Sequence, residues 1–174
     1  MSDDAVLKTA LDQMETLIRD AARQPDAATP CSDWSAEQLS EHVVASTLTF
    51  LRSARGEQVD WSAPPPVVDG DLAETFATAA ADLLEARADA GEAAGPADML
   101  LAEYAVHSWD LAMAIGRSTE RLDPQVAERG AAFMSANLTD DRRGDAFDPA
   151  QPAPEDADAY TRIAAFAGRQ VGAA

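Results

Sequence analysis

The chain has 174 residues, a length that predicts one domain, residues 1–174, with a sizeable hydrophobic core. Its 13 basic and 31 acidic residues give a formal charge of -18, which is spread along most of the sequence. Nucleic acid and anionic membrane surfaces are therefore excluded as partners, because both are bound largely through Lys and Arg side chains.

The sequence also predicts a cytoplasmic protein. Its N-terminus, MSDDAVLK, has neither the basic start nor the apolar run of a signal peptide. No apolar run approaches the roughly 20 residues that a membrane span requires, and one cysteine cannot form an intramolecular disulfide. Abundant alanine with few aromatic or β-branched residues favours helix over strand.

The first two helices have clear sequence signals. Apolar residues spaced three and four apart predict a helix over about 3–23. Ser35 and Gln38 then form a capping box in front of a second helix, over about 36–54. Trp34, which precedes the cap, is expected to pack on Leu39 as a hydrophobic staple.

The middle of the chain contains a connection and two further helices. Residues 56–70 include three consecutive prolines and are expected to form an extended surface connection. Within it, Trp61 either lines a pocket or, more simply, covers one end of the helical core. A third helix is predicted over 72–90, and a central helix over about 96–116, which Gly116 ends in a left-handed conformation.

The C-terminal third predicts shorter helices. Asp123 as N-cap and Pro124 in the first turn open a fifth helix, which runs to about residue 137. Residues 140–154 are expected to be a charged loop that contains several prolines, and a last helix is predicted over about 157–167. The predicted fold class is therefore all-α.

A carboxylate and an imidazole interrupt the apolar face of the central helix. Glu103 and His107 are four residues apart, so they share one stripe with Leu100, Leu111 and Ala114. A buried carboxylate needs a partner, because an unpaired one takes up a proton or costs several kcal/mol. A divalent metal is one such partner.

The second of the two histidines tests this idea. His42 lies on the apolar stripe of its own helix, and two facing helices can bring such inward side chains together. His42, Glu103 and His107 are therefore candidate metal ligands, with at least one coordination position left for water or substrate. The alternative is that Glu103 and His107 hydrogen-bond each other as an i,i+4 pair and bind no metal.

Three further residues are candidates for other roles. Cys31 precedes a helix N-terminus, where a thiol pKa can fall, so it is either a nucleophile or an inert residue packed beneath Trp34. Asp110 either orients His107 or makes an ordinary hydrogen bond. Trp109 is expected in the core or an interface. The catalytic residues, a general base included, are not assigned.

Three segments together resemble a known family: TPCSDWSAEQLSEHVV, EYAVHSWDLAMAIG and PEDADAYTRIAAFAGR. They are similar to the landmarks of actinobacterial metal-binding proteins related to the N-terminal domain of mycothiol-dependent maleylpyruvate isomerase, in the DinB-like superfamily. The resemblance spans nearly the whole chain. It implies a DinB-like four-helix bundle with additional short C-terminal helices, and a divalent metal held on the bundle axis by His42, Glu103 and His107.

The resemblance also implies a function. It points to a metal-dependent enzyme, a thiol transferase or isomerase-like, that uses a low-molecular-weight thiol such as mycothiol on a small electrophile. Zinc suits the ligands best, although nickel, iron and manganese accept the same donors. The isomerase has a further C-terminal domain, and this sequence ends soon after Arg169, so the parts of the substrate site that this domain supplies are expected to be missing.

Two other classes of function remain open. One is a non-catalytic module that binds a metal or a small ligand, for which a homodimer is one arrangement. The other is a purely structural helical bundle, which would bind no metal.

Overall fold

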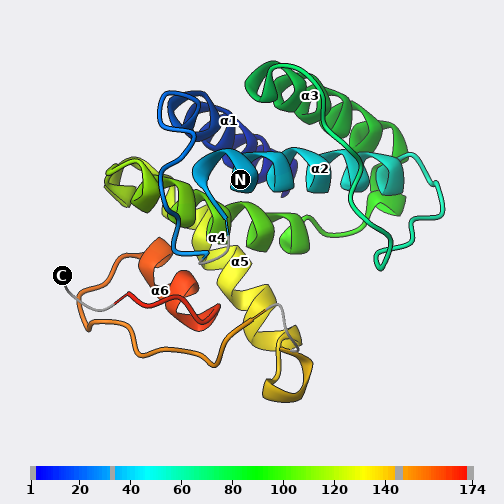
Figure 1. Cartoon of the computed structure of the whole chain (residues 1–174). Coiled ribbons are helices and arrows are strands. Elements are labelled where there is room, and N and C mark those ends of the chain that lie inside the picture. The colour runs from blue at the N-terminus through cyan, green and yellow to red at the C-terminus, as the bar shows by residue number, and fades with distance from the viewer. Residues whose placement is uncertain (1–2, 32–33, 144–146, 172–174) are drawn as a thin grey trace.

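A computed structural model of the chain describes residues 3–31, 34–143 and 147–171. Its six α-helices, in chain order, are α1 (Asp3–Ala21), α2 (Ala36–Ala54), α3 (Leu72–Ala90), α4 (Asp98–Ala114), α5 (Pro124–Asn137) and α6 (Ala159–Phe166) (Figure 1). Three 3-10 turns join them: η1 (Gly91–Ala94), η2 (Thr119–Arg121) and η3 (Asp140–Arg142). Over the described ranges there is no strand, only one isolated antiparallel bridge between Ala28 and Ser35, so the all-α prediction is confirmed.

Side-chain caps mark the starts of α2, α3, α5 and α6. The Ser35 backbone N–H donates to Gln38 Oε1 at 2.9 Å, and the Gln38 backbone N–H donates to Ser35 Oγ at 3.4 Å, so the predicted capping box is formed and α2 begins at Ala36. Aspartate side chains accept backbone N–H groups at the starts of three further helices. These are Asp71 for α3, Asp123 for α5 and Asp158 for α6.

The start of α4 differs from the prediction. The helix begins at Asp98, so Pro96 lies before it and not in its first turn. The buried guanidinium of Arg87 donates to the carbonyls of Ala94 and Gly95, at 3.3 and 3.0 Å, and so holds the chain in the η1 turn up to that point. The end of α4 agrees with the prediction, because Gly116 has φ +68 and follows the last turn as a left-handed residue.

Two other predicted helices are shorter in the structure. α1 ends at Ala21 and not near Arg23. The Arg23 N–H donates to the carbonyl of Asp20, three residues back, and not to the carbonyl four residues back as in an α-helix. α6 starts at Ala159, since Asp158 caps it, and ends at Phe166. Residues 144–146 of the predicted loop over 140–154 lie outside the described residues.

α4 is the central helix of the molecule. It packs against α1 and α2, and also against α5 and α6, which Figure 1 shows below it, away from α2 and α3. Trp109 is buried, as predicted, with 5% of its surface exposed. The buried positions of α4 cover almost every turn: Leu100, Leu101, Ala102, Tyr104, Ala105, Val106, His107, Ser108, Trp109, Asp110, Leu111 and Ala112.

Residues 56–70 form the extended surface connection that the prolines predict. The Trp61 ring lies 5.7 Å from the Phe50 ring, between ring centroids, and 58% of Trp61 is exposed. Trp61 therefore partly covers a core residue near the C-terminal end of α2. No helix in the described part of the chain is both long and apolar enough to cross a membrane.

α4 and α5 approach each other closely at Gly130. A Cβ atom placed at this position would meet the Ala102 Cα at 2.8 Å and the Leu101 carbonyl oxygen at 3.0 Å. Both neighbours are backbone atoms, which cannot move aside like the end of a flexible side chain. Gly130 therefore sets the distance between the two helices.

Replacing this glycine should destabilise the fold. We expect Gly130→Ala to lower the free energy of unfolding by about 1–3 kcal/mol, because the added methyl forces α5 away from α4. This loss should appear although alanine is the better helix former by about 1 kcal/mol. Urea denaturation measures the change, with Ser135→Ala on the exposed face of α5 as a control that should stay within about 0.5 kcal/mol of wild type. A Gly130→Ala protein as stable as wild type would contradict the close approach.

Candidate metal centre

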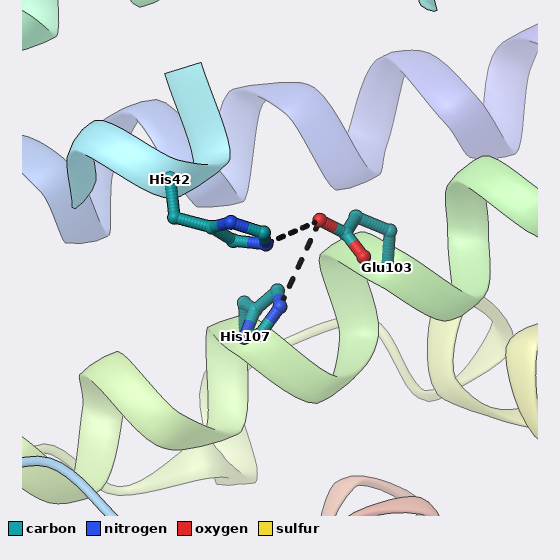
Figure 2. Close-up of side chains that lie close together, drawn as sticks. All are labelled: His42, Glu103 and His107. Carbon is teal, nitrogen blue, oxygen red and sulfur yellow. Dashed lines mark hydrogen bonds and ion pairs between the residues drawn. The ribbon is translucent and has the colours of Figure 1, made fainter. Parts of the chain in front are cut away.

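Two facing helices bring the three predicted ligands together (Figure 2). His42 comes from α2, while Glu103 and His107 lie one turn apart on α4. One donor atom from each residue lies within 4.8 Å of the other two. A search of the described residues for groups of at least three His, Cys, Asp or Glu side chains that could hold a metal ion finds these three residues. The stripes of the two helices had predicted this meeting.

The spacing of the donor atoms fits a metal ion. Glu103 Oε1 lies 3.1 Å from His42 Nε2 and 3.7 Å from His107 Nε2. A tetrahedral metal with bonds of roughly 2.0–2.1 Å would place its donors about 3.3–3.4 Å apart. The two distances from Glu103 Oε1 lie on either side of that value, and all three donor atoms lie within 4.8 Å of one another, a spacing that is compatible with one ion between them.

One side of the group is open to solvent and the other is buried. The side chains of His42 and Glu103 are 30% and 24% exposed, whereas that of His107 is 9% exposed. A small molecule could therefore approach from the side of His42 and Glu103. This arrangement differs from a structural metal site, in which four protein ligands close the coordination sphere.

The charges of the three side chains are coupled. Burial raises the pKa of the Glu103 carboxyl, but the charge of His107 and a hydrogen bond from His42 outweigh it and lower the pKa to about 2. Burial also lowers the pKa of His107, but the negative charge of Glu103 and the hydrogen bond to Asp110 outweigh it and raise the pKa. Glu103 therefore carries its negative charge at neutral pH.

The i,i+4 hydrogen bond between Glu103 and His107, which was the alternative to a metal site, is not formed. His107 Nε2 and Glu103 Oε1 are 3.7 Å apart, beyond hydrogen-bond distance. Glu103 is hydrogen-bonded instead to His42 of the facing helix, at 3.1 Å. The carboxylate thus joins α2 to α4, which is how a shared ligand group would be arranged.

Asp110 has the orienting position that its spacing had suggested. Its Oδ2 lies 3.1 Å from Nδ1 of His107, on the side of the ring away from Glu103, and Asp110 is fully buried. The Asp110 carboxylate also accepts two hydrogen bonds from Arg169, from Nε at 3.0 Å and from Nη2 at 2.9 Å. Burial raises the pKa of Asp110, but these partners outweigh it and lower the pKa.

Sequence reasoning missed two neighbours of the site. The Trp34 ring centroid lies 4.5 Å from that of His42, so Trp34 covers the imidazole as well as the edge of the core. Arg169 had received no role. The sequence did contain a signal for such a residue. Asp110 lies on a helix that is apolar on most sides, and a buried carboxylate needs a partner such as an arginine.

Cys31 lies at the edge of the same network. Its Sγ is 3.5 Å from Nη2 of Arg169, and its thiol is partly buried. Ser32 and Asp33, in the Cys-x-x-Trp segment, lie outside the described residues. Both earlier interpretations of Cys31, as a nucleophile and as packing beneath Trp34, stay predictions.

The Glu103 charge should be visible in the pH dependence of stability. The ordinary pKa of 4.5 is lowered to about 2 in the metal-free fold, so the unfolded chain binds more protons between these values. The stability from this carboxylate is complete above pH 4.5 and is lost as the pH falls toward 2. Over that window, we expect chelator-treated wild type to lose about 2 kcal/mol more unfolding free energy than Glu103→Gln.

Denaturant titrations at a series of pH values measure this difference. Glu41→Gln removes an exposed carboxylate from the same helix as His42 and should follow the wild-type profile. If the Glu103→Gln and wild-type profiles ran parallel, the Glu103 carboxylate would not be stabilised by the two histidines.

Comparison with known proteins shows that the chain is similar to two mycobacterial proteins. It is 32% identical over 169 residues to the uncharacterized proteins MT0763 and Rv0738 of Mycobacterium tuberculosis, strains CDC 1551 and H37Rv. Each alignment covers 86% of this chain and 87% of the relative. No family model and no solved structure matches the chain. The extent and identity of these alignments show that the chain belongs to the same protein family as these two mycobacterial proteins.

Proposed function

We propose that the protein binds a divalent metal, most simply zinc, through His42, Glu103 and His107. The observation that carries this proposal is the donor geometry: two imidazoles and a carboxylate from facing helices, at spacings that bracket those of a tetrahedral site. Nickel, iron and manganese accept the same donors. The hydrogen bond from His107 to Asp110 adds support, because histidine ligands generally bond a carboxylate or carbonyl through their other ring nitrogen.

We also propose that the fold is a DinB-like four-helix bundle. The contacts among α1, α2, α3 and α4 support this, with the ligands on α2 and α4 and the shorter α5 and α6 packed on α4. The motif resemblance to actinobacterial metal-binding proteins supports it further, and so do relatives from an actinobacterium. The resemblance includes the three ligand positions themselves.

We infer further that the protein is an enzyme, a thiol transferase or isomerase-like, that uses a mycothiol-type thiol on a small electrophile. Three protein ligands and an exposed edge at His42 and Glu103 support this, because they leave room for a ligand from solution. A bound divalent metal would supply a way to deprotonate a coordinated thiol at neutral pH.

The protein's own residues would set the charge and shape of this site. Glu103 would contribute a single negative charge and the two histidines would bind as neutral donors, so these ligands would leave a divalent ion with a net positive charge, which favours an anionic thiolate. Asp110 and Arg169 neutralise each other and leave that balance unchanged. The Trp34 ring packs on the His42 ring, with 4.5 Å between the ring centroids, and so helps to hold this imidazole in place.

Metal should stabilise the fold without being required for it. We expect a chelator to lower the melting temperature by roughly 3–10 °C. Removal of the metal leaves the buried charge of Glu103 less well paired, which should cost about 1–3 kcal/mol of unfolding free energy. The metal-free chain should still unfold cooperatively, since its helices bury a large apolar core. Differential scanning calorimetry measures both effects, and in His107→Ala the chelator should have no effect. Equal melting curves from protein that holds stoichiometric metal would contradict this coupling.

Catalysis is tested with the metal-loaded protein, mycothiol and a panel of small electrophiles. We expect conversion of an electrophile above the uncatalysed rate, in which the thiol is consumed by a transfer or returned by an isomerisation. This conversion should be lost in His107→Ala and kept in the surface control Glu41→Gln. Metal content is measured in the same samples. If no turnover occurs while the metal stays bound, the protein is a metal-binding or small-ligand module and not an enzyme. If wild type takes up no metal at all, the ligand assignment itself is wrong.

A further inference from the structure

Arg169 reaches the site from the turn that follows α6. Gly168 has φ +95, and a Cβ atom there would lie 2.6 Å from the carbonyl oxygen of Asp148, so this position requires glycine. The Arg169 N–H bonds the Ala164 carbonyl at 3.0 Å, which closes the turn. The backbone therefore leaves α6 in one direction, and the Arg169 side chain extends to Asp110 on α4.

The contact between Arg169 and Asp110 is two-pronged and shielded from water. The guanidinium donates from Nε to one carboxylate oxygen and from Nη2 to the other, at 3.0 and 2.9 Å. Asp110 is fully buried, and the Arg169 side chain is 11% exposed. A buried carboxylate without such a partner would take up a proton or move toward solvent. Arg169 thus keeps Asp110 ionised and in a fixed orientation.

An ionised Asp110 can only accept hydrogen bonds, which determines the proton on His107. Asp110 Oδ2 lies 3.1 Å from His107 Nδ1, so that nitrogen must be the donor. Neutral His107 carries one ring proton, for which Asp110 at 3.1 Å and Glu103 at 3.7 Å compete. The nearer, fixed acceptor leaves Nε2 with a free lone pair, directed toward Glu103 and His42 (Figure 2).

We propose that Arg169 is a positioning residue of the metal centre, which acts through Asp110 to hold His107 in the orientation and tautomer that a metal requires. This inference rests on the metal binding proposed above. It makes a residue of the C-terminal turn part of a site whose ligands all lie on α2 and α4. A merely structural ion pair would stabilise the docking of α6 and leave the affinity for metal unchanged.

Zinc affinity separates these two roles. Competition with a chromophoric chelator should show Zn²⁺ binding 10- to 100-fold weaker in Arg169→Gln and in Asp110→Asn. Arg169→Lys keeps the charge but not the two-pronged contact, so its loss should be smaller. Arg87→Gln is the matched control, because it removes another buried arginine, one that bonds Asp4 and the carbonyls of Ala94 and Gly95. Its affinity should stay within about twofold of wild type.

The double variant tests whether Arg169 acts through Asp110. In an Asp110→Asn background, Arg169→Gln should weaken Zn²⁺ binding by less than about twofold more, since the carboxylate it orients is gone. If the loss of Zn²⁺ affinity in the double variant equalled the product of the losses in the two single variants, Arg169 would act by a route that does not involve Asp110. An affinity loss in Arg87→Gln as large as that in Arg169→Gln would reduce the effect to general destabilisation. Either result overturns the proposal.

A second measurement needs no metal. Proton–nitrogen NMR of the metal-free protein, at a pH where His107 is neutral, should show its proton on Nδ1 in wild type and a shift toward Nε2 in Arg169→Lys and Arg169→Gln. A wild-type proton on Nε2 would overturn the proposal. If wild type shows the Nδ1 proton and the dependence on Arg169 but binds no Zn²⁺, the proposed metal function fails while the positioning of His107 stands.

Discussion

Charged groups on the buried helix α4 have to be compensated by residues from other parts of the chain. α4 places Glu103, His107 and Asp110 within two turns, on a helix that other helices surround. A carboxylate in such surroundings is stable only when it is paired and hydrogen-bonded. His42 provides this from α2, and Arg169 provides it from the turn after α6. The two contacts therefore join α4 to elements far away in the sequence.

This compensation divides the centre into a buried side and an exposed side. On the buried side, Arg169, Asp110 and His107 form a continuous series of hydrogen bonds with fixed directions. On the exposed side, His42 and Glu103 are reachable from solvent, beneath the ring of Trp34. A rigid support next to an accessible edge is the combination that a reactive metal centre needs, since one ligand is held in place while room remains for a substrate.

Local signals made most of the fold predictable from sequence. The capping box predicted the start of α2, and the approximate ranges predicted for α2 and α3 agree with the structure. The helical period placed His42, Glu103 and His107 on inward faces, and this was enough to predict their meeting. The start of α4 was wrong by two residues because Arg87, a residue of the preceding helix, fixes the chain there.

Features that depend on how distant elements dock could not be derived in the same way. The contact of Arg169 with Asp110 joins positions 59 residues apart, and no periodicity links the end of α6 to α4. The helical period predicted that His42 would lie near Glu103, but it did not decide between a hydrogen bond from His42 and the alternative i,i+4 bond from His107. Sequence reasoning identified the side chains that need a partner, and the packing of the helices determined which partner each of them found.

The most direct test of the account is elemental analysis of the protein after purification without a nickel column. The account predicts about one equivalent of a divalent transition metal per chain in wild type. It predicts almost none in His107→Ala, and almost none in the double variant that combines His42→Ala with His107→Ala. The variants must be shown to be folded by circular dichroism. A folded wild-type protein that contains no metal, and takes up none when Zn²⁺, Ni²⁺, Fe²⁺ or Mn²⁺ is added, would contradict the account.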